Sequence, residues 1–373
     1  PRTTAPGGAR GPRGRAIVRA AGRVPPACGK GSQVHRRAIS IADSAIQTKP
    51  ELARRAEAAG FDVIWNSGES IPVFASMLER TSSARIGSGV IRAFQFDPRN
   101  LAQHAADLQR IYDRRFILGL GGGTKYMNIN SLGRDFPNPA SHIRELIRFL
   151  RHAWSVPGDE RLSFNGRFVR VEGQGLRHRG SDPAEDVSAP IYLAAVNEGM
   201  LRLAGDLCDG LCGHPIASVR FIEEHVWPHV DEGLRRSGRR RADFDHQSWL
   251  TFAISRDRRQ ALRELKVHVA RFMATRSYSV VLDSQGYGDV RERIRDAFVN
   301  HPDDPDALAA AIPDEVAAEH GLYGTPDDVA EQAQRYEGVI DTLCFYSASN
   351  TMDSERVLEN LEFAIEALGP RSA

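Results

Sequence analysis

Short apolar runs alternate with longer helix-like segments from Ala38 to the end of the chain. Several of the apolar runs are unbroken, which is typical of strands in a parallel sheet buried on both faces. The expected strands are residues 38–42, 61–65, 84–91, 115–120, 190–195, 210–214, 248–255 and 341–347. The expected helices are residues 49–60, 71–81, 97–112, 139–154, 198–209, 218–238, 256–274 and 353–368. Eight strand–helix units predict an α/β protein, a (β/α)8 TIM barrel.

Local helix signals support this reading. Asp97 is placed to cap the helix 97–112, and Pro98 takes its first position. Two segments are additional to the eight strand–helix units of a minimal barrel. Residues 161–173 predict a hairpin that turns at Asn165-Gly166, and residues 278–324 predict an inserted pair of helices. We expect both insertions to lie over one end of the barrel.

The first 37 residues differ from the rest. They contain nine Arg and Lys and no acidic residue, and they sustain no periodicity. This composition predicts a disordered basic arm in front of a single barrel domain, residues 38–373. A functionless extension is the favoured interpretation, and a contact for an anionic partner or an Arg-rich transit peptide are the alternatives.

The whole-chain composition excludes several classes. A formal net charge of +1 gives no nucleic-acid signal, and no apolar run approaches the roughly 18 residues of a membrane helix. The four cysteines form no disulfide framework, which favours a reducing, cytoplasmic location. Cys208, Cys212 and His214 are read as part of a helix end and a strand rather than as metal ligands. The basic run 233–241 is read as a solvated helix end and turn.

The stretch 115–126, RFILGLGGGTKY, ends a strand in three consecutive glycines. It fits neither G-x-G-x-x-G nor G-x-x-x-x-G-K-[ST], because Thr124 stands where each motif needs its last glycine. A flexible turn is the plain alternative. The residues that follow the other strands include few carboxylates and one histidine, so we expect no metal site. A glycine-rich barrel mouth with few acid–base groups suits an organic cofactor.

The chain resembles the bacterial luciferase-like monooxygenases, which include oxidoreductases that use the deazaflavin coenzyme F420. The resemblance runs from about Ala38 to Leu368. It is carried by LARRAEAAGFDVIW, ARIGSGVIRAFQFDPRNLAQHAADL, RRFILGLGGGTKYMNINSLG, PIYLAAVNEGMLRLAGDLCDGLCGHP and GTPDDVAEQ, in this order.

The resemblance implies a flavin-type cofactor site at three strand ends. Its residues are Ser88, Gly89 and Val90; Gly119, Gly121, Gly122, Gly123 and Thr124; and Ala195, Val196, Asn197 and Glu198. The last group opens a helix, and a helix N-terminus attracts phosphate. The Glu198 side chain is therefore expected to point away from the phosphate. The resemblance also implies a non-prolyl cis peptide at Gly89–Val90, with a strand of small, closely packed residues as the alternative.

One departure concerns the second strand. Many F420-dependent members have an Asp-His pair after it, whereas this chain has WNSGES. Glu69 and His214 are the remaining acid–base candidates. The predicted substrate pocket is Asp43, Asn66, Ser67, Phe94, Tyr126 and Asn128, with core or lid packing as the alternative for the aromatic residues.

The expected function is hydride transfer between F420 and a small organic substrate, and a homodimer is one expected assembly. The anionic tail of F420 needs cations near the rim, and Lys125, Arg134, Arg177 and Arg179 are candidates. An FMN-dependent monooxygenase that uses O2 is the first alternative. A catalytically silent flavin-binding barrel is the second.

Overall fold

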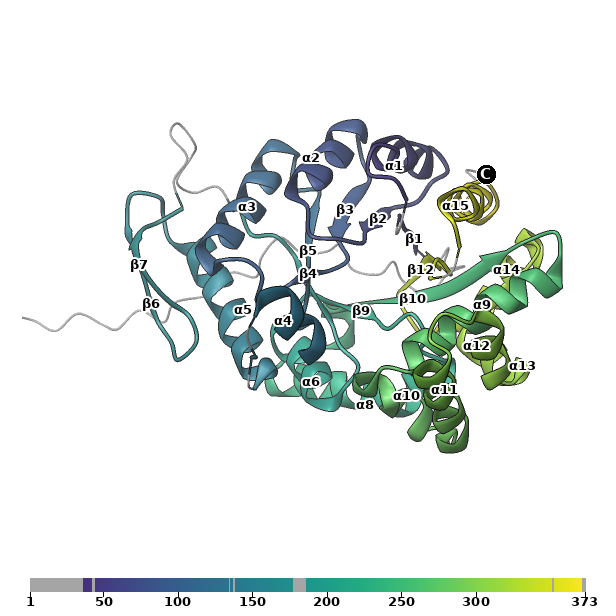
Figure 1. The fold of residues 1–373 in the computed structure, drawn as a ribbon. Helices are drawn as coiled ribbons and strands as arrows, with labels where there is room; N and C mark the ends of the chain where they lie inside the picture. The colour runs from purple at the N-terminus through teal and green to yellow at the C-terminus, as the bar shows by residue number, and fades with distance from the viewer. Residues whose placement is uncertain are drawn as a thin grey trace, which may run out of the picture.

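The computed structural model describes residues 36–41, 44–133, 135–136, 138–176, 186–350 and 352–370. Eight parallel strands close into a barrel, with helices around it (Figure 1). The strands in barrel order are β1 (Arg36–Ser40), β2 (Val63–Asn66), β3 (Arg85–Ser88), β5 (Phe116–Gly121), β8 (Ile191–Ala194), β9 (Gly210–Gly213), β10 (Asp245–Ile254) and β12 (Thr342–Ser347). The barrel closes because β10 pairs with β9 on one side and β12 on the other, and β12 pairs with β1. The predicted barrel is confirmed.

Eight main helices follow these strands and cover the outside of the barrel. They are α1 (Lys49–Ala58), α2 (Ile71–Arg80), α3 (Pro98–Ile111), α5 (Pro139–Ser155), α6 (Glu198–Leu207), α8 (Trp227–Arg236), α9 (Arg258–Met273) and α15 (Ser354–Leu368). In α3 the Asp97 carboxylate accepts hydrogen bonds from the backbone N–H of Arg99 and Asn100, as its position predicts. None of the helices in the described ranges has the length and apolar character needed to cross a bilayer.

Several shorter elements complete the fold. They are β4 (Ile91–Arg92), α4 (Lys125–Leu132), β6 (Arg161–Asn165), β7 (Arg170–Gln174), α7 (Val219–Phe221), the π-helical turn Ile222–Val226, the 3-10 turns Arg241–Asp243, Arg276–Tyr278 and Gln334–Tyr336, α10 (Ser279–Asp283), α11 (Gly288–Asn300), α12 (Pro305–Ala311), α13 (Asp314–His320), β11 (Leu322–Gly324) and α14 (Pro326–Ala333). The insertion between α9 and β11 therefore contains four short helices rather than the expected pair.

The hairpin β6–β7 is confirmed, but its position and turn differ from the prediction. Its loop is Gly166–Val169, and the Glu145 carboxylate of α5 accepts hydrogen bonds from the backbone N–H of Phe168 (2.8 Å) and Val169 (2.7 Å). Phe164 packs against Phe149 of α5. The hairpin thus lies at the periphery, against the outer side of α5, and not over the barrel end (Figure 1).

Two further boundaries differ from the sequence-based prediction. Strand β1 begins at Arg36, where the basic arm was expected to continue. The Arg36 guanidinium bonds Asp245, and Arg37 bonds the Leu368 carbonyl, so both belong to the barrel. The rest of the predicted arm lies outside the described residues. Helix α4 stands where a loop was expected, because the Thr124 hydroxyl caps it by accepting from Met127 N–H.

A hydrogen-bonded polar layer fills the N-terminal end of the barrel. Its centre is the Asp245 carboxylate on β10, which accepts bonds from Arg36 (2.9 Å) and from the Tyr192 hydroxyl (2.7 Å). Gln247 donates to the same carboxylate and accepts from the Trp65 indole N–H. This end of the barrel is therefore closed by bonded side chains.

Candidate active site at the barrel mouth

Aromatic side chains and a cis peptide form the floor of the C-terminal mouth of the barrel. Trp65, Trp249 and Tyr346 belong to the inner cluster, and Trp249 lies between the other two rings. The Gly89–Val90 peptide is cis, which confirms the prediction. A Cβ at Gly89 would lie 2.4 Å from the Trp249 ring, so this strand end and the indole are in direct contact.

The glycines at the end of β5 and just after it are glycine for different structural reasons. A Cβ at Gly119 would lie 1.9 Å from the Ser88 carbonyl oxygen, and one at Gly121 would lie 2.6 Å from the Val90 side chain. Both glycines are therefore required by packing within the barrel wall. A Cβ at Gly122 meets only Ile143, at 3.4 Å. Gly123 has φ +62°, a left-handed conformation that favours glycine. Of these four glycines, Gly122 is the one where a Cβ has room without a close clash or a left-handed backbone, with Ile143 of α5 as its neighbour.

The predicted phosphate-binding turn, residues 195–198, is hydrogen-bonded to two neighbouring segments. Ala195 and Val196 are buried, and Asn197 precedes the first residue of α6. The Asn197 amide donates to the Ser277 carbonyl (3.2 Å), so its side chain does not cap the helix. The ring Nε2 of His225, in the π-helical turn, bonds the Val196 carbonyl (3.2 Å). These contacts leave the N-terminus of α6 without a side-chain cap.

The Glu198 side chain runs along α6 rather than across its N-terminus. Its carboxylate accepts a hydrogen bond from Arg202, one turn further on (2.9 Å). This charge-assisted bond lowers the pKa of Glu198. The carboxylate is thus kept from the position that a phosphate would need, as the sequence predicts.

The carboxylate of Glu69 is engaged by Arg92 of β4. It accepts from the Arg92 backbone N–H (2.8 Å) and from two guanidinium nitrogens (2.7 and 3.1 Å). A carboxylate in this arrangement anchors the β4 segment at the mouth. Its predicted role as an acid–base group remains a prediction.

The predicted substrate residues fall into two groups. Asn66 is buried at the end of β2, and its amide oxygen accepts from the Lys49 ammonium (2.6 Å), which also approaches the Ser67 carbonyl. Asn128 is buried on α4, where its Nδ2 donates to the Gly122 carbonyl while Oδ1 has no hydrogen-bond partner within the described ranges. Asn66 and Ser67 thus lie at the end of β2, whereas Asn128 reaches the end of β5 from α4. Asp43 lies outside the described residues.

The aromatic candidates are not brought together in the pocket. The ring of Phe94 stacks on Phe136 with 4.2 Å between centroids, and it also contacts His142. This placement favours the packing alternative for Phe94. Tyr126 is 76% exposed on α4, so it lies on the surface. The sequence alone does not decide between a pocket role and a packing role, because an aromatic residue near a strand end suits both.

His214 follows β9 and is buried at the mouth. Its ring lies 4.2 Å from the Tyr278 ring and 5.4 Å from the Phe272 ring, centroid to centroid. Burial lowers the pKa of His214 from 6.5 to about 3, so the ring is neutral near pH 7. His268 of α9 also contacts Phe272, and sequence reasoning missed it because it lies within a helix rather than after a strand.

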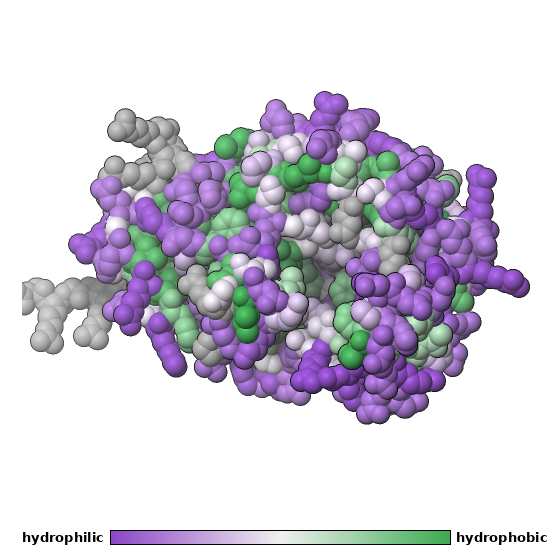
Figure 2. All heavy atoms as spheres, viewed as in Figure 1, coloured by the Kyte–Doolittle hydropathy of each residue, from purple (hydrophilic) through white to green (hydrophobic). Residues whose placement is uncertain are grey.

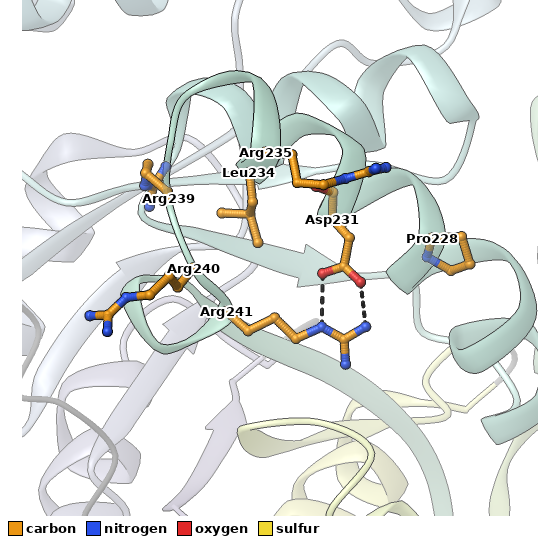
Figure 3. Close-up of a pocket in the computed structure, with 7 residues that line it drawn as sticks. All are labelled: Pro228, Asp231, Leu234, Arg235, Arg239, Arg240 and Arg241. Carbon is orange, nitrogen blue, oxygen red and sulfur yellow. Dashed lines mark hydrogen bonds and ion pairs between the residues drawn. The ribbon is translucent and has the colours of Figure 1, made fainter.

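The surface around the mouth is hollowed near the centre of the face in Figure 2, where hydrophobic and near-neutral residues lie between polar rims. A separate surface depression lies beside the α8–β10 connection, toward the N-terminal end of β10 (Figure 3). There Arg241 forms a two-point ion pair with Asp231, and Arg240 pairs with Asp243. The basic run 233–241 is therefore a helix end and turn whose charges are largely neutralised locally. Among the described side chains, no group of three His, Cys, Asp or Glu is placed to hold a metal ion.

The barrel thus combines a hydrogen-bonded lower end with a mouth lined by glycine backbone and aromatic side chains. The chain belongs to the luciferase-like monooxygenase family, whose sequence model matches residues 29–342. A protein of unknown function from Mycobacterium tuberculosis is 30% identical over 310 residues, which cover 78% of this chain and 89% of that protein.

An F420-dependent glucose-6-phosphate dehydrogenase from Intrasporangium calvum is 28% identical over 303 residues, covering 76% of this chain and 83% of that enzyme. The solved structure of the F420-dependent tetrahydromethanopterin reductase from Methanopyrus kandleri superposes with a TM-score of 0.74. It covers 90% of this chain and 97% of that one at 21% identity, which shows the shared fold.

Proposed function

We propose that this protein is an oxidoreductase that binds coenzyme F420 and exchanges a hydride with a small organic substrate. When bound, F420 supplies hydride chemistry at C5 of its ring. Family membership and the F420-dependent relative support the proposal. The observation that carries it is the cis peptide Gly89–Val90 packed against the glycines that end β5, together with an uncapped helix N-terminus at Asn197.

The residues present fit such a cofactor. Val90 and the backbone of Gly122 offer an apolar surface for a flat ring, and Asn128 Oδ1 is a buried acceptor at the same strand end. The backbone N–H groups after Asn197 suit a phosphate, because they lie at the positive end of the α6 dipole. The aromatic side chains on the floor of the mouth, Trp65, Trp249 and Tyr346, would exclude water from a ring held there.

The cofactor tail distinguishes F420 from FMN. Both molecules end the ribityl chain in a phosphate, but F420 continues into an anionic lactyl-glutamate chain. Among the predicted tail contacts, Lys125 pairs with Asp135 (2.8 Å), whereas Arg134, Arg177 and Arg179 lie outside the described residues. Arg177 and Arg179 remain proposed contacts for the tail.

The test is a pair of titrations of the purified protein with F420 and with FMN at fixed salt, followed by fluorescence. We expect F420 to bind at least tenfold more tightly than FMN. The double variant Arg177→Gln/Arg179→Gln should weaken F420 more than FMN, and Arg167→Gln/Arg170→Gln on the β6–β7 hairpin is the matched charge control. Tighter binding of FMN, or equal loss of both cofactors, would favour the O2-using monooxygenase instead. Binding of neither would reject a flavin-type site.

A cytoplasmic location is part of the proposal, since Cys208, Cys212 and Cys344 are buried, unpaired thiols.

A homodimer remains a prediction that light scattering on the purified protein tests. A fully inactive protein that still binds F420 would favour the silent flavin-binding barrel.

A further inference from the structure

Two buried histidines from distant parts of the chain lie against the same aromatic ring at the mouth. His214 follows β9, and His268 lies in the last turns of α9. The Phe272 ring is 5.4 Å from the His214 ring and 5.0 Å from the His268 ring. Phe272 in turn packs on the inner barrel cluster, so both imidazoles belong to the wall of the mouth.

The hydrogen bonds of each ring identify which nitrogen carries the proton. Asn350 N–H points to Nδ1 of His268 at 3.3 Å, and Ile216 N–H points to Nδ1 of His214 at 3.5 Å. A nitrogen that accepts cannot hold the proton of a neutral imidazole, so Nε2 is the N–H donor in both rings. Within the described part of the chain, neither Nε2 has a hydrogen-bond partner, although both are buried.

The surroundings of the two rings are uncharged. The rings in contact with them are Phe272, Tyr278 and Tyr346. Burial lowers the pKa of both histidines to about 3, and the neighbouring His214 ring lowers the pKa of His268 further. Among the described residues, no Lys, Arg, Asp or Glu side chain lies close enough to shift the pKa of either histidine. An anionic group seated here would lose its hydration without gaining a counter-charge.

We propose that His214 and His268 donate hydrogen bonds to an uncharged oxygen acceptor of the substrate, a carbonyl or hydroxyl group, and thereby select neutral substrates over carboxylates and phosphates. This inference rests on the proposed function, because it places the substrate beside the cofactor at the same mouth. A buried donor without a partner discriminates strongly for a ligand that completes its bond.

The test uses two matched pairs of probes that differ by one carboxylate: cyclohexanone with 4-oxocyclohexanecarboxylate, and benzaldehyde with 4-formylbenzoate. Each probe is titrated into the full chain labelled with 15N-histidine, and the imidazole nitrogens are followed by NMR at pH 7. We expect a neutral probe to shift the Nε2 signals of His214 and His268. His246 is the internal control, because it is equally buried but packs on Trp227 in the helix layer.

Two variants separate a binding role from a structural one. His268→Leu removes the donor and should weaken the neutral probe about tenfold, whereas His268→Gln restores an N–H and should keep its affinity within about threefold. Both variants should bind F420 as the wild type does. If the wild type itself does not bind F420, the proposed function fails; if only the variants lose F420, His268 belongs to the cofactor site and the inference fails. Unmoved Nε2 signals with both neutral probes, equal or tighter binding of the carboxylates, or unchanged affinity in His268→Leu would each overturn the inference.

Discussion

The two ends of the barrel interior differ in whether their buried polar groups have hydrogen-bond partners. At the N-terminal end, the Asp245 carboxylate accepts bonds from Arg36, Tyr192, Gln247 and Thr342. At the C-terminal end, several buried polar atoms have no partner within the described residues. They are Trp249 Nε1, His214 Nε2, His268 Nε2 and Asn128 Oδ1.

This difference separates stability from function. Buried polar groups in folded proteins are nearly always hydrogen-bonded, so the bonded layer stabilises the barrel, and the unpaired atoms at the mouth are candidates for contacts with a ligand. The lower layer also prevents the barrel interior from opening at both ends. Substitutions at the two ends should therefore affect different measurements.

The largest effect is expected at the lower end. Asp245→Ala leaves the Arg36 guanidinium and the Tyr192 hydroxyl without their shared acceptor, and the Asp245 side chain is only 3% exposed. Breaking such a buried charged network costs about 3–5 kcal/mol of unfolding free energy. Urea unfolding measures it, with the partly exposed Asp243→Ala as the control. A loss below about 1 kcal/mol would contradict the structural role of this layer.

The next effect is expected at the mouth and on binding alone. Gly122→Val places a branched side chain on the glycine turn after β5, and we expect at least a 100-fold loss of F420 affinity, or about 2.7 kcal/mol. Stability should change by less than about 1 kcal/mol, because a Cβ at Gly122 meets only Ile143. Gly173→Val on the β6–β7 hairpin is the matched control, since nothing lies within 4 Å of its Cβ position. Unchanged affinity would remove Gly122 from the site.

The pH dependence of stability has opposite signs for His268 at the mouth and for Asp341 near the lower end. Burial lowers the pKa of His268 to about 3, so the unfolded chain binds a proton below pH 6.5 that the folded chain does not, and stability falls on acidification. Near the lower end, burial raises the pKa of Asp341 from 3.8 to about 6, so its contribution to stability is present at low pH and is lost as pH rises.

Urea unfolding between pH 7 and pH 5 measures both contributions. His268→Asn should reduce the loss of stability by up to about 1.4 kcal/mol per pH unit. Asp341→Asn should make the loss steeper, because it removes the opposing contribution. His214 and His246 keep the overall direction the same, since burial lowers the pKa of each to about 3. A slope that both variants leave unchanged would show that these groups do not titrate as their burial implies.

The smallest effect is expected at the surface depression of Figure 3. Arg240 is 80% exposed, and its pairing with Asp243 is screened by solvent. Arg240→Ala should change stability by less than about 0.5 kcal/mol and leave F420 affinity unchanged. A marked loss of cofactor affinity would show that this end of the barrel is not merely structural.

Much of the fold is encoded locally. The strand–helix alternation, the cap at Asp97 and the glycines after β5 all depend on residues a few positions apart, so the sequence predicts the elements and where the mouth lies. The cis peptide at Gly89–Val90 was implied by the family resemblance and is present. What the sequence by itself determined is therefore the barrel, its direction and the strand ends that form its mouth.

The tertiary structure decided what each side chain does there. Arg92 forms an ion pair with the Glu69 carboxylate. The Ser88 carbonyl oxygen lies where a side chain at Gly119 would be, and Glu145 accepts hydrogen bonds from the β6–β7 turn. His268 reaches the mouth from α9, although helical periodicity alone assigns it to a packed helix face. Each of these contacts joins residues that are far apart in the chain, and local sequence patterns carry no information about such distant pairs. They arise only when the barrel closes and brings the strand ends and α9 together.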